Sequence, residues 1–375
     1  MTIRIMLTDA SYKHTLGAVR TLGKRGFHMI AGSTSRHSIS FYSKYCQERV
    51  IYPSPRNEKE FVGFLCNYAC EKKVDVILPI GYLASTTLSR HKSEFDGLAK
   101  LPVADYEFMQ IAGDKDRTMK FAASLGIKVP KMYTEKDNIS SFPVVVKGLM
   151  ESGTVKYANS NHDLSQFDLK NSLIQEYIPG QGYGFFALFN QGKPRAIFMH
   201  KRIREYPRTG GPSTVAESVY DEELKIQGLR LLKALNWHGV AMVEFKKDSR
   251  DNEFKLMEIN PKFWGSLDLA TASGVDFPYL TTKMALEGDI EPVFKFRTGV
   301  KFRWLFPDDT LHLLSNPRCV KTFMADFFDR DMQTNIWLGD LVPNLLQVGD
   351  TALQFFHRIK SGTLRYPHGV PRVNL

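Results

Sequence analysis

The most informative segment of this chain reads Leu256-Met-Glu-Ile-Asn-Pro-Lys-Phe-Trp-Gly-Ser266. It begins as an alternation of apolar and other residues, which is typical of a half-buried strand. A second alternating run, Val240–Phe245, precedes it, and the polar stretch 247–252 between them has the composition of a turn. The two runs therefore predict a β-hairpin in which Glu244 and Glu258 are opposite or diagonal neighbours.

Residues of equal parity share one face of a strand. Glu244 therefore lies on the face of Val240 and Met242, and Glu258 lies on the face of Asn260. Two carboxylates and an amide oxygen on an otherwise apolar sheet face suit a hard cation such as Mg²⁺ carrying nucleotide phosphates. The sequence therefore predicts a metal site formed by Glu244, Glu258 and Asn260.

The whole phrase from Glu258 to Ser266 resembles the metal-binding segment of ATP-grasp enzymes, whose pattern is Glu-x-Asn-x-Arg or Glu-Ile-Asn-Pro-Arg. It is most similar to the ATP-dependent carboligases (carboxylate–amine ligases), in which the phrase continues into Phe-Trp-Gly-Ser. The resemblance implies an α/β and α+β architecture, namely the ATP-grasp fold with an N-terminal Rossmann-like (pre-ATP-grasp) domain. It further implies ATP and Mg²⁺ as cofactors, with Mn²⁺ as an alternative, and substrate binding by Gly265 and Ser266.

Composition limits the class of protein. With 375 residues, 43% hydrophobic and 24% charged, the chain is an ordinary globular protein of two or three domains. The N-terminus lacks the basic head and long apolar stretch of a signal peptide, and no run approaches the roughly 18 apolar residues of a membrane helix. Four cysteines show neither disulfide nor zinc spacing. We expect a cytoplasmic protein with free thiols and no membrane span.

The formal charge of +10 raises the question of nucleic acid. The basic residues are spread along the chain without a recognised nucleic-acid motif. Anionic small substrates, ATP among them, explain the excess equally well. We therefore expect ATP and small carboxylate and amine substrates as partners and no nucleic acid, and a homodimer stays open.

The first hundred residues alternate short apolar runs with helical stretches, which favours a parallel α/β sheet. The first turn, Thr8–Thr15, lacks the Gly-x-Gly-x-x-Gly of a nicotinamide-binding domain. The resemblance makes residues 1–106 a nucleotide-free domain that helps to hold the acceptor substrate. The expected strands are Ile3–Leu7, His28–Ala31, Arg49–Tyr52 and Val74–Pro79, and the expected helices are Leu16–Arg25, Glu58–Glu71 and Ala84–Phe95.

A helix over Met109–Leu125 and then a β-rich region follow, which indicates an α+β unit. Residues 107–293 are expected to form the ATP-grasp domain with two α+β subdomains, and 294–375 a C-terminal extension without an assigned role. The expected elements of the second part are the strands Pro143–Lys147, Thr154–Ala158, Leu173–Tyr177, Gly184–Phe189 and Ala196–His200, and the helix Glu222–Leu235.

Two lysines mark the expected phosphate site. The segment Ala112–Lys115 opens a helix and resembles the Gly-Asp-Lys at which the ATP-grasp domain begins, where the lysine reaches a phosphate. Lys147 ends an apolar strand, and the resemblance places its ammonium on the α- and β-phosphates under the loop Gly148–Gly153. That loop keeps fewer glycines than is common in the family.

The run Leu173–Gly180 resembles the hinge strand of the family. The resemblance assigns the adenine edge to Glu176 and to the backbone of Tyr177 and Ile178. Many relatives place an acidic residue after the hinge for the ribose hydroxyls, whereas this chain has Gln181, whose amide can also bond a hydroxyl.

A row of cations and a diglycine loop follow in the segment His200–Ser213, which suits anionic groups. Similar phrases occur in carboligase-like ATP-grasp proteins. The resemblance implies that Arg202 stabilises the transferring phosphoryl group and that Arg204 and Arg208 grip the substrate carboxylate.

The reaction implied is attack of a carboxylate on the γ-phosphate of ATP, followed by capture of the acyl phosphate by an amine. Lys262 stands where the family pattern has arginine, which keeps the charge but loses the bidentate fork. We assign it a catalytic contact. An ATP-grasp carboxylase and a non-catalytic ATP-binding regulatory module remain alternatives.

Overall fold

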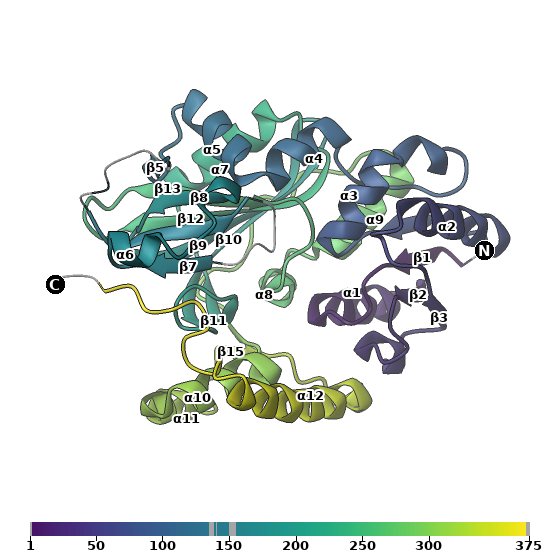
Figure 1. The fold of residues 1–375 in the computed structure, drawn as a ribbon. Coiled ribbons are helices and arrows are strands. Elements are labelled where there is room, and N and C mark those ends of the chain that lie inside the picture. Colours follow the sequence, from purple (N-terminus) through teal and green to yellow (C-terminus); the bar gives the residue numbers. More distant parts are fainter. Residues whose placement is uncertain (1, 135–138, 140, 150–154, 373–375) are drawn as a thin grey trace.

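Three β-sheets organise the chain in the computed structural model, which describes residues 2–134, 139, 141–149 and 155–372. Figure 1 shows an N-terminal α/β layer on the right, a large and a small sheet facing each other on the left, and a group of C-terminal helices below. The parallel α/β N-terminal region and the β-rich region after it, both expected from the sequence, are present.

The N-terminal sheet is parallel, in the order β3-β2-β1-β4. Strands β1, β2 and β4 are short runs of mostly buried residues, as is usual when helices cover both faces of a sheet, whereas the edge strand β3 buries only Val50. The strands are β1 (Arg4–Leu7), β2 (His28–Ser33), β3 (Glu48–Ile51) and β4 (Val76–Leu78), and the helices are α1 (Lys13–Lys24), η1 (Ile39–Tyr42), α2 (Glu58–Lys72), α3 (Tyr82–Arg90) and η2 (Lys92–Phe95). The helix expected over Ala84–Phe95 is thus interrupted at His91.

The single helix predicted over Met109–Leu125 is wrong, because the chain forms α4 (Tyr106–Gly113) and α5 (Lys115–Ser124) instead. Asp114 between them is extended, and its carboxylate accepts hydrogen bonds from the first free amides of α5. An aspartate in this position is a strong N-cap, which favours a new helix over continuation of the old one. The break turns Lys115 toward the sheets.

The small sheet is antiparallel, in the order β5-β8-β6-β7, and Val144, Val146 and Ile174 form its own apolar core. The predicted strands of this region are confirmed, with ends within one or two residues. The elements are β5 (Met132–Tyr133), β6 (Val144–Gly148), β7 (Val155–Ala158), α6 (Asn161–Leu164), η3 (Leu169–Asn171) and β8 (Ser172–Glu176).

The large sheet has the order β13-β12-β9-β10-β11-β14-β15. Phe185 and Trp237 lie in the core on the side of the sheet that α7 covers, whereas Phe186 and Trp264 lie in the core shared with the N-terminal domain. The elements are β9 (Gly180–Asn190), β10 (Lys193–Glu205), β11 (Ser213–Ser218), α7 (Glu222–Ala234), β12 (Gly239–Asp248), β13 (Phe254–Asn260), α8 (Leu267–Ala272), α9 (Phe277–Glu287), β14 (Lys301–Arg303) and β15 (Met332–Thr334).

The residues after 293 complete this sheet, because β14 pairs with β11 and β15 pairs with β14. The remaining C-terminal elements are η4 (Leu305–Asp309), α10 (Thr310–Ser315), η5 (Pro317–Cys319), α11 (Val320–Ala325) and α12 (Leu341–Lys360). The helices that the structure describes include none long and apolar enough to cross a bilayer.

A buried ion pair ties α12 to the N-terminal domain. Arg20 Nε lies 2.8 Å from Asp340 Oδ2, and both residues are almost fully buried. Asp340 also accepts hydrogen bonds from Ser43 Oγ at 2.8 Å and from the Lys44 amide at 2.9 Å. Burial acts to raise the pKa of Asp340, but these donors outweigh it and hold that pKa below its ordinary value.

Asp340→Ala is expected to lower the free energy of unfolding by about 3–5 kcal/mol, because it leaves the Arg20 charge buried and unpaired. Chemical denaturation measures the loss, and Asp350→Ala, at an exposed position of the same helix, is the matched control. Since the folded-state pKa of Asp340 is depressed, the difference from wild type is fully present above about pH 4 and shrinks as the pH falls further. Equal stability of the two variants would contradict this role.

Candidate active site

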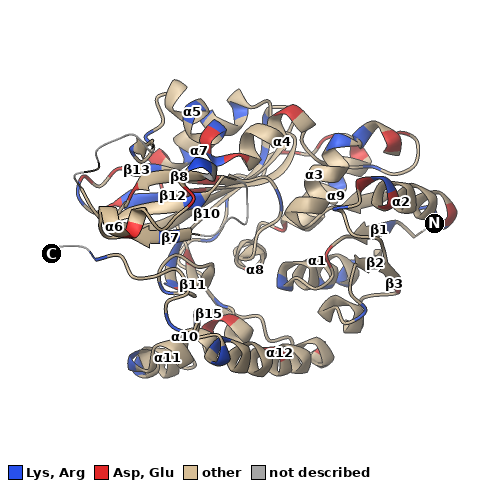
Figure 2. Cartoon of the chain, viewed as in Figure 1, with Lys and Arg blue, Asp and Glu red and all other residues tan. Residues whose placement is uncertain are grey.

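A cleft of about 380 Å³ lies between the small and the large sheet. This volume is in the range of small-molecule sites. Figure 2 shows basic and acidic segments close together around β8, β10 and β12, which border the cleft. The residues that line it and were expected from the sequence are Lys115, Lys147, Glu176, Tyr177, Ile178, Arg202, Glu244, Glu258, Asn260, Lys262, Gly265 and Ser266.

The floor of the cleft carries the predicted acidic pair. Glu244 on β12 is directly opposite Glu258 on β13, and Met242 is opposite Asn260, so the expected hairpin neighbours are confirmed. The side chains of the two glutamates are 17% and 28% exposed. Asn260 donates a hydrogen bond from Nδ2 to Glu258 Oε1 at 2.9 Å.

The donor chemistry of this trio fits a hard divalent cation, because carboxylate and amide oxygens are the ligands that Mg²⁺ prefers. The described part of the chain contains no group of three or more His, Cys, Asp or Glu residues placed to hold a metal. A cation in this cleft would therefore be held by the two carboxylates and the amide, together with groups of its ligand.

Cations balance the two glutamates unequally. Burial acts to raise the pKa of Glu258, but Lys115, at 3.8 Å from its Oε2, and Lys147 outweigh burial and lower that pKa. Burial raises the pKa of Glu244, and repulsion by Glu258 raises it further. Arg202, whose Nη2 lies 2.5 Å from Glu244 Oε2, offsets these effects only in part. The pKa of Glu258 is thus lowered and that of Glu244 is raised, so a bound cation would favour the ionised form of Glu244.

Both lysines expected to reach phosphates lie at the cleft. Lys147 is the penultimate residue of β6, and burial lowers its pKa. Lys115 is only 6% exposed, and its amide donates to Leu149 O at 3.1 Å, which joins α5 to the loop after Lys147. The rest of the predicted phosphate loop, up to Gly153, lies outside the described residues.

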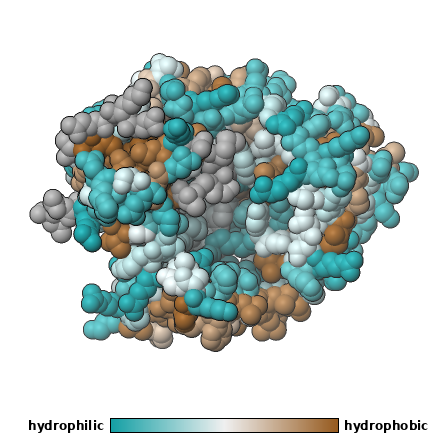
Figure 3. Space-filling view, in the orientation of Figure 1, coloured by the Kyte–Doolittle hydropathy of each residue, from teal (hydrophilic) through white to brown (hydrophobic). Residues whose placement is uncertain are grey.

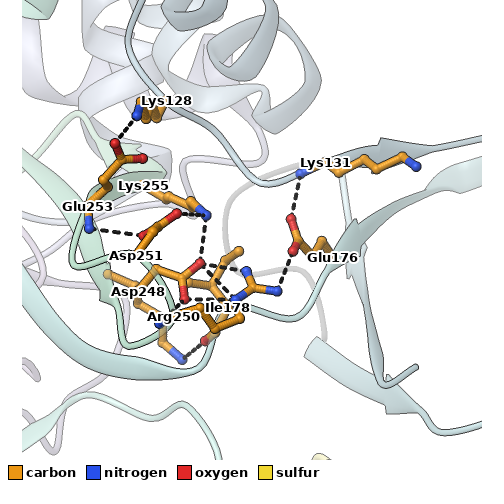
Figure 4. Close-up of polar contacts among 10 residues, drawn as sticks. Lys128, Lys131, Glu176, Ile178, Asp248, Arg250, Asp251, Glu253 and Lys255 are labelled. Carbon is orange, nitrogen blue, oxygen red and sulfur yellow. Dashed lines mark hydrogen bonds and ion pairs between the residues drawn. The ribbon is translucent and has the colours of Figure 1, made fainter. Parts of the chain in front are cut away.

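The hinge segment is braced by the turn between β12 and β13 (Figure 4). The Glu176 carboxylate accepts from Arg250 at 2.7 Å and from the Lys131 amide at 3.2 Å. Ile178 O accepts from Lys246 Nζ at 3.0 Å. The carboxylate of Glu176 is thus engaged in holding the hinge in place.

Three predicted residues lie outside this cleft and line a neighbouring hollow. Gln181 donates from Nε2 to Arg202 O at 2.8 Å. Arg204 makes two 3.0 Å bonds to the buried Asp309 and a further ion pair with Asp326. Arg208 Nη1 is 3.4 Å from Tyr366 Oη. Their ligand-binding roles stay predictions, and the contacts of Arg204 hold the C-terminal segment against β10.

The diglycine loop after β10 forms one wall, and Gly211 is required there. A Cβ atom at Gly211 would lie 2.1 Å from the backbone of Tyr206, so a side chain cannot be accommodated. Arg202 Nη1 donates to Gly211 O at 3.3 Å, which connects the loop to the arginine.

Lys262 lies where the cleft meets the N-terminal domain. Its charge favours the ionised form of Glu258 and also of Asp9, whose pKa burial raises. Ser266 Oγ lies 3.0 Å from His200 Nε2, so the two phrases of the sequence that carry the family resemblance are joined by a hydrogen bond.

Sequence reasoning missed Gln175, Glu205 and Lys246, which also line the cleft. Gln175 is 1% exposed, and its Nε2 has no hydrogen-bond partner among the described residues. The alternation of side chains along a strand could have identified two of them. Gln175 lies two residues before Tyr177, and Lys246 lies two residues after Glu244, so each is expected on the same face as a predicted site residue. No comparable signal marks Glu205.

Comparisons with known proteins agree with this geometry. A family model described as "ATP-grasp in the biosynthetic pathway with Ter operon" matches residues 168–306. D-alanine–D-alanine ligase of Fusobacterium nucleatum subsp. nucleatum is 24% identical over 184 residues, which cover 44% of this chain. The match spans 64% of the length of that relative.

Solved structures share the fold at low sequence identity. N5-carboxyaminoimidazole synthetase from Staphylococcus aureus is 17% identical with a TM-score of 0.66, covering 84% of this chain and 86% of its own. L-amino acid ligase from Bacillus licheniformis is 17% identical with a TM-score of 0.62, covering 78% of each chain.

The biotin carboxylase domain of Hydrogenobacter thermophilus 2-oxoglutarate carboxylase, solved with MgADP and bicarbonate, is 13% identical with a TM-score of 0.64. The likeness covers 80% of this chain and 73% of that one. With its three sheets, its hairpin of paired glutamates and its lysine-flanked cleft, this chain has the ATP-grasp fold with a Rossmann-like N-terminal domain that was expected from the sequence. Residues 168–306 match an ATP-grasp family model, and the chain is similar to a D-alanine–D-alanine ligase and to an L-amino acid ligase.

Proposed function

We propose that this chain is an Mg²⁺-dependent ligase that uses ATP to join a carboxylate to an amine. The observation that carries the proposal is the pair Glu244 and Glu258, placed opposite each other in a cleft that Lys115, Lys147 and Arg202 also line. The relationship to a D-alanine–D-alanine ligase and the fold shared with an L-amino acid ligase support the same class of reaction.

The cleft suggests how ATP would lie. The adenine would enter the slot beside the hinge, where Val145, Met257 and the backbone of Tyr177 and Ile178 combine apolar contact with polar groups. The phosphates would then extend toward Lys115 and Lys147. Glu244, Glu258 and Asn260 would hold Mg²⁺, which when bound neutralises phosphate charge.

The chemistry would proceed in two displacements. An oxygen of the substrate carboxylate attacks the γ-phosphorus of ATP, the bond to the β-phosphate bridge breaks, and ADP leaves. The amine nitrogen then attacks the acyl carbon, phosphate departs with the bonding electron pair, and the nitrogen loses a proton. Arg202 and Lys262 would stabilise the charge that develops on the transferring group, and positioning supplies most of the remaining rate enhancement.

The decisive assay incubates the full chain with Mg-ATP and a panel of amino acids and short peptides while ADP and phosphate are measured. ADP and phosphate released only with a pair of acceptors support the ligase. AMP with pyrophosphate would show that the γ-phosphoryl mechanism is wrong. Bicarbonate-dependent ADP release without an amine would instead identify the carboxylase alternative.

Glu258→Gln is expected to reduce Mg-ATP turnover by roughly a hundredfold or more, because losing a metal ligand exceeds the 10- to 100-fold typical of supporting residues. The substitution preserves shape, so the circular dichroism spectrum should match that of wild type. Glu253→Gln is the matched control, since Glu253 pairs with Lys128 on the exposed turn of the same hairpin. Wild-type turnover by a folded Glu258→Gln protein would refute the metal assignment.

Lys262→Ala is expected to lower kcat/KM by roughly ten- to a hundredfold, the effect of removing a charge-assisted contact worth about 1.5–3 kcal/mol. Lys262→Arg keeps the charge and restores the fork of the family pattern, so it should retain much more activity than alanine does. Steady-state kinetics with saturating ATP and varied acid substrate compare the two. Equal kcat/KM for wild type and Lys262→Ala would mean that Lys262 makes no working contact.

A further inference from the structure

Helix α12 is oriented with its polar side toward the protein and its apolar side outward. Its buried residues are Pro343, Asn344, Gln347 and Thr351. Asn344 Oδ1 accepts from Arg20 at 3.0 Å, so this polar side makes specific contacts with the N-terminal domain. The exposed stripe consists of Leu341, Leu345, Val348, Leu353, Phe356 and Ile359.

This arrangement reverses the usual one, in which the apolar stripe of a surface helix faces the core. The exposures are large, 70% for Leu345 and 67% for Phe356. On the inward side, Asn344 also donates to Trp337 O at 3.0 Å, and Thr351 donates to Gln347 O at 2.6 Å. The apolar side chains of the outward side are largely exposed. The apolar outer face of α12 is therefore exposed to contact with another molecule.

The apolar surface continues beyond α12. Met324 on α11, Phe327 and Phe328 just after it, and Leu338 before α12 are all exposed, Phe328 by 83%. Figure 3 shows brown side chains along the lower edge of the molecule, where Figure 1 places α10, α11 and α12. An apolar face over several helical turns exceeds the scattered exposure of single side chains that is normal for monomers.

The rim of this face is basic. Lys321 lies on α11 beside Val320, and Lys360 lies four residues after Phe356 on the same side of α12. Three further basic residues of this C-terminal region are exposed, namely Arg318, Arg330 and Arg365. Two acidic residues, Asp331 and Asp350, are exposed in the same region. The α12 stripe itself contains no charged side chain, and Figure 2 shows most of the helix uncoloured with blue at the end near α11.

The charge around this apolar face distinguishes between the possible binding partners. In a two-fold dimer, the basic residues at the edge of this face would lie close to the same basic residues of the second copy. A typical protein interface has about one hydrogen bond per 100–200 Å², whereas the side chains of the α12 stripe are all apolar. An apolar stripe along a helix with basic residues at its edge suits the boundary between headgroups and acyl chains of an anionic bilayer. Lysines at such a surface add attraction to acidic lipids.

We propose that the outer face of α11 and α12 docks on the surface of an anionic lipid bilayer, with Leu345 and Phe356 entering the acyl boundary. The chain would then lie on the membrane without spanning it, and its ATP site would remain in the aqueous phase. This proposal is independent of the reaction catalysed, since none of these residues lines the cleft.

Co-sedimentation of the full chain with vesicles tests the proposal. Wild type is expected to pellet with vesicles of phosphatidylcholine and phosphatidylglycerol and to bind pure phosphatidylcholine vesicles much more weakly. Leu345→Gln/Phe356→Gln, which changes no charge, should lower the partition coefficient roughly tenfold or more. Lys321→Gln/Lys360→Gln should lower it roughly fivefold for each lysine, and only on anionic vesicles.

Ile226→Gln is the matched control, because Ile226 on α7 is 56% exposed and distant in sequence from this face. It should bind as wild type does, and circular dichroism should show all variants folded. Wild type that remains in the supernatant, or variants that all bind equally, would overturn the proposal. So would light scattering that finds a wild-type dimer converted to monomers by Leu345→Gln/Phe356→Gln, since a second copy would then be the cover.

Discussion

The pairing of β12 with β13 is the constraint on which the candidate site depends. Strand side chains alternate, so a shift of one residue would turn Glu244 or Glu258 into the apolar core on the opposite side of the sheet. The observed register keeps both glutamates on the cleft side, with Met242 opposite Asn260. Placing two carboxylates face to face in a half-buried position is unfavourable by itself. Lys115, Lys147 and Arg202 offset this repulsion, so the acidic and basic residues require one another.

Much of this arrangement was predictable because it is encoded locally. Alternation within each strand and one polar turn were enough to predict the β12–β13 hairpin, and alternating apolar runs and helices were enough for the N-terminal parallel sheet. Contacts between distant segments were not predictable in this way. The acids that engage Arg204 lie 105 and 122 residues further along the chain, so an arginine in a basic strand gave no sign of that structural role. The same reason explains why β14 was not expected in the large sheet.

Helix α12 shows another limit of sequence patterns. Apolar residues repeated at helical spacing show that a helix has one apolar and one polar face. The pattern does not show which of the two faces packs against the rest of the protein. Here the polar face found partners in Arg20 and its surroundings, and the apolar face was left outside. The orientation of α12 depends on the N-terminal domain, because the buried guanidinium of Arg20 requires oxygen acceptors and finds them on the polar face of this helix.

The bond between Arg20 and Asp340 also orders events during synthesis of the chain. The two residues are 320 positions apart, so a ribosome adding 5–20 residues per second needs roughly 15–60 s between them. Once the first domain has been synthesised, it therefore contains an arginine whose carboxylate partner does not yet exist for the rest of that interval. The N-terminal domain is thus translated first but completed last, and its surface around α1 and η1 is the part of the nascent protein that waits longest for protection by a chaperone or by its own C-terminal helix.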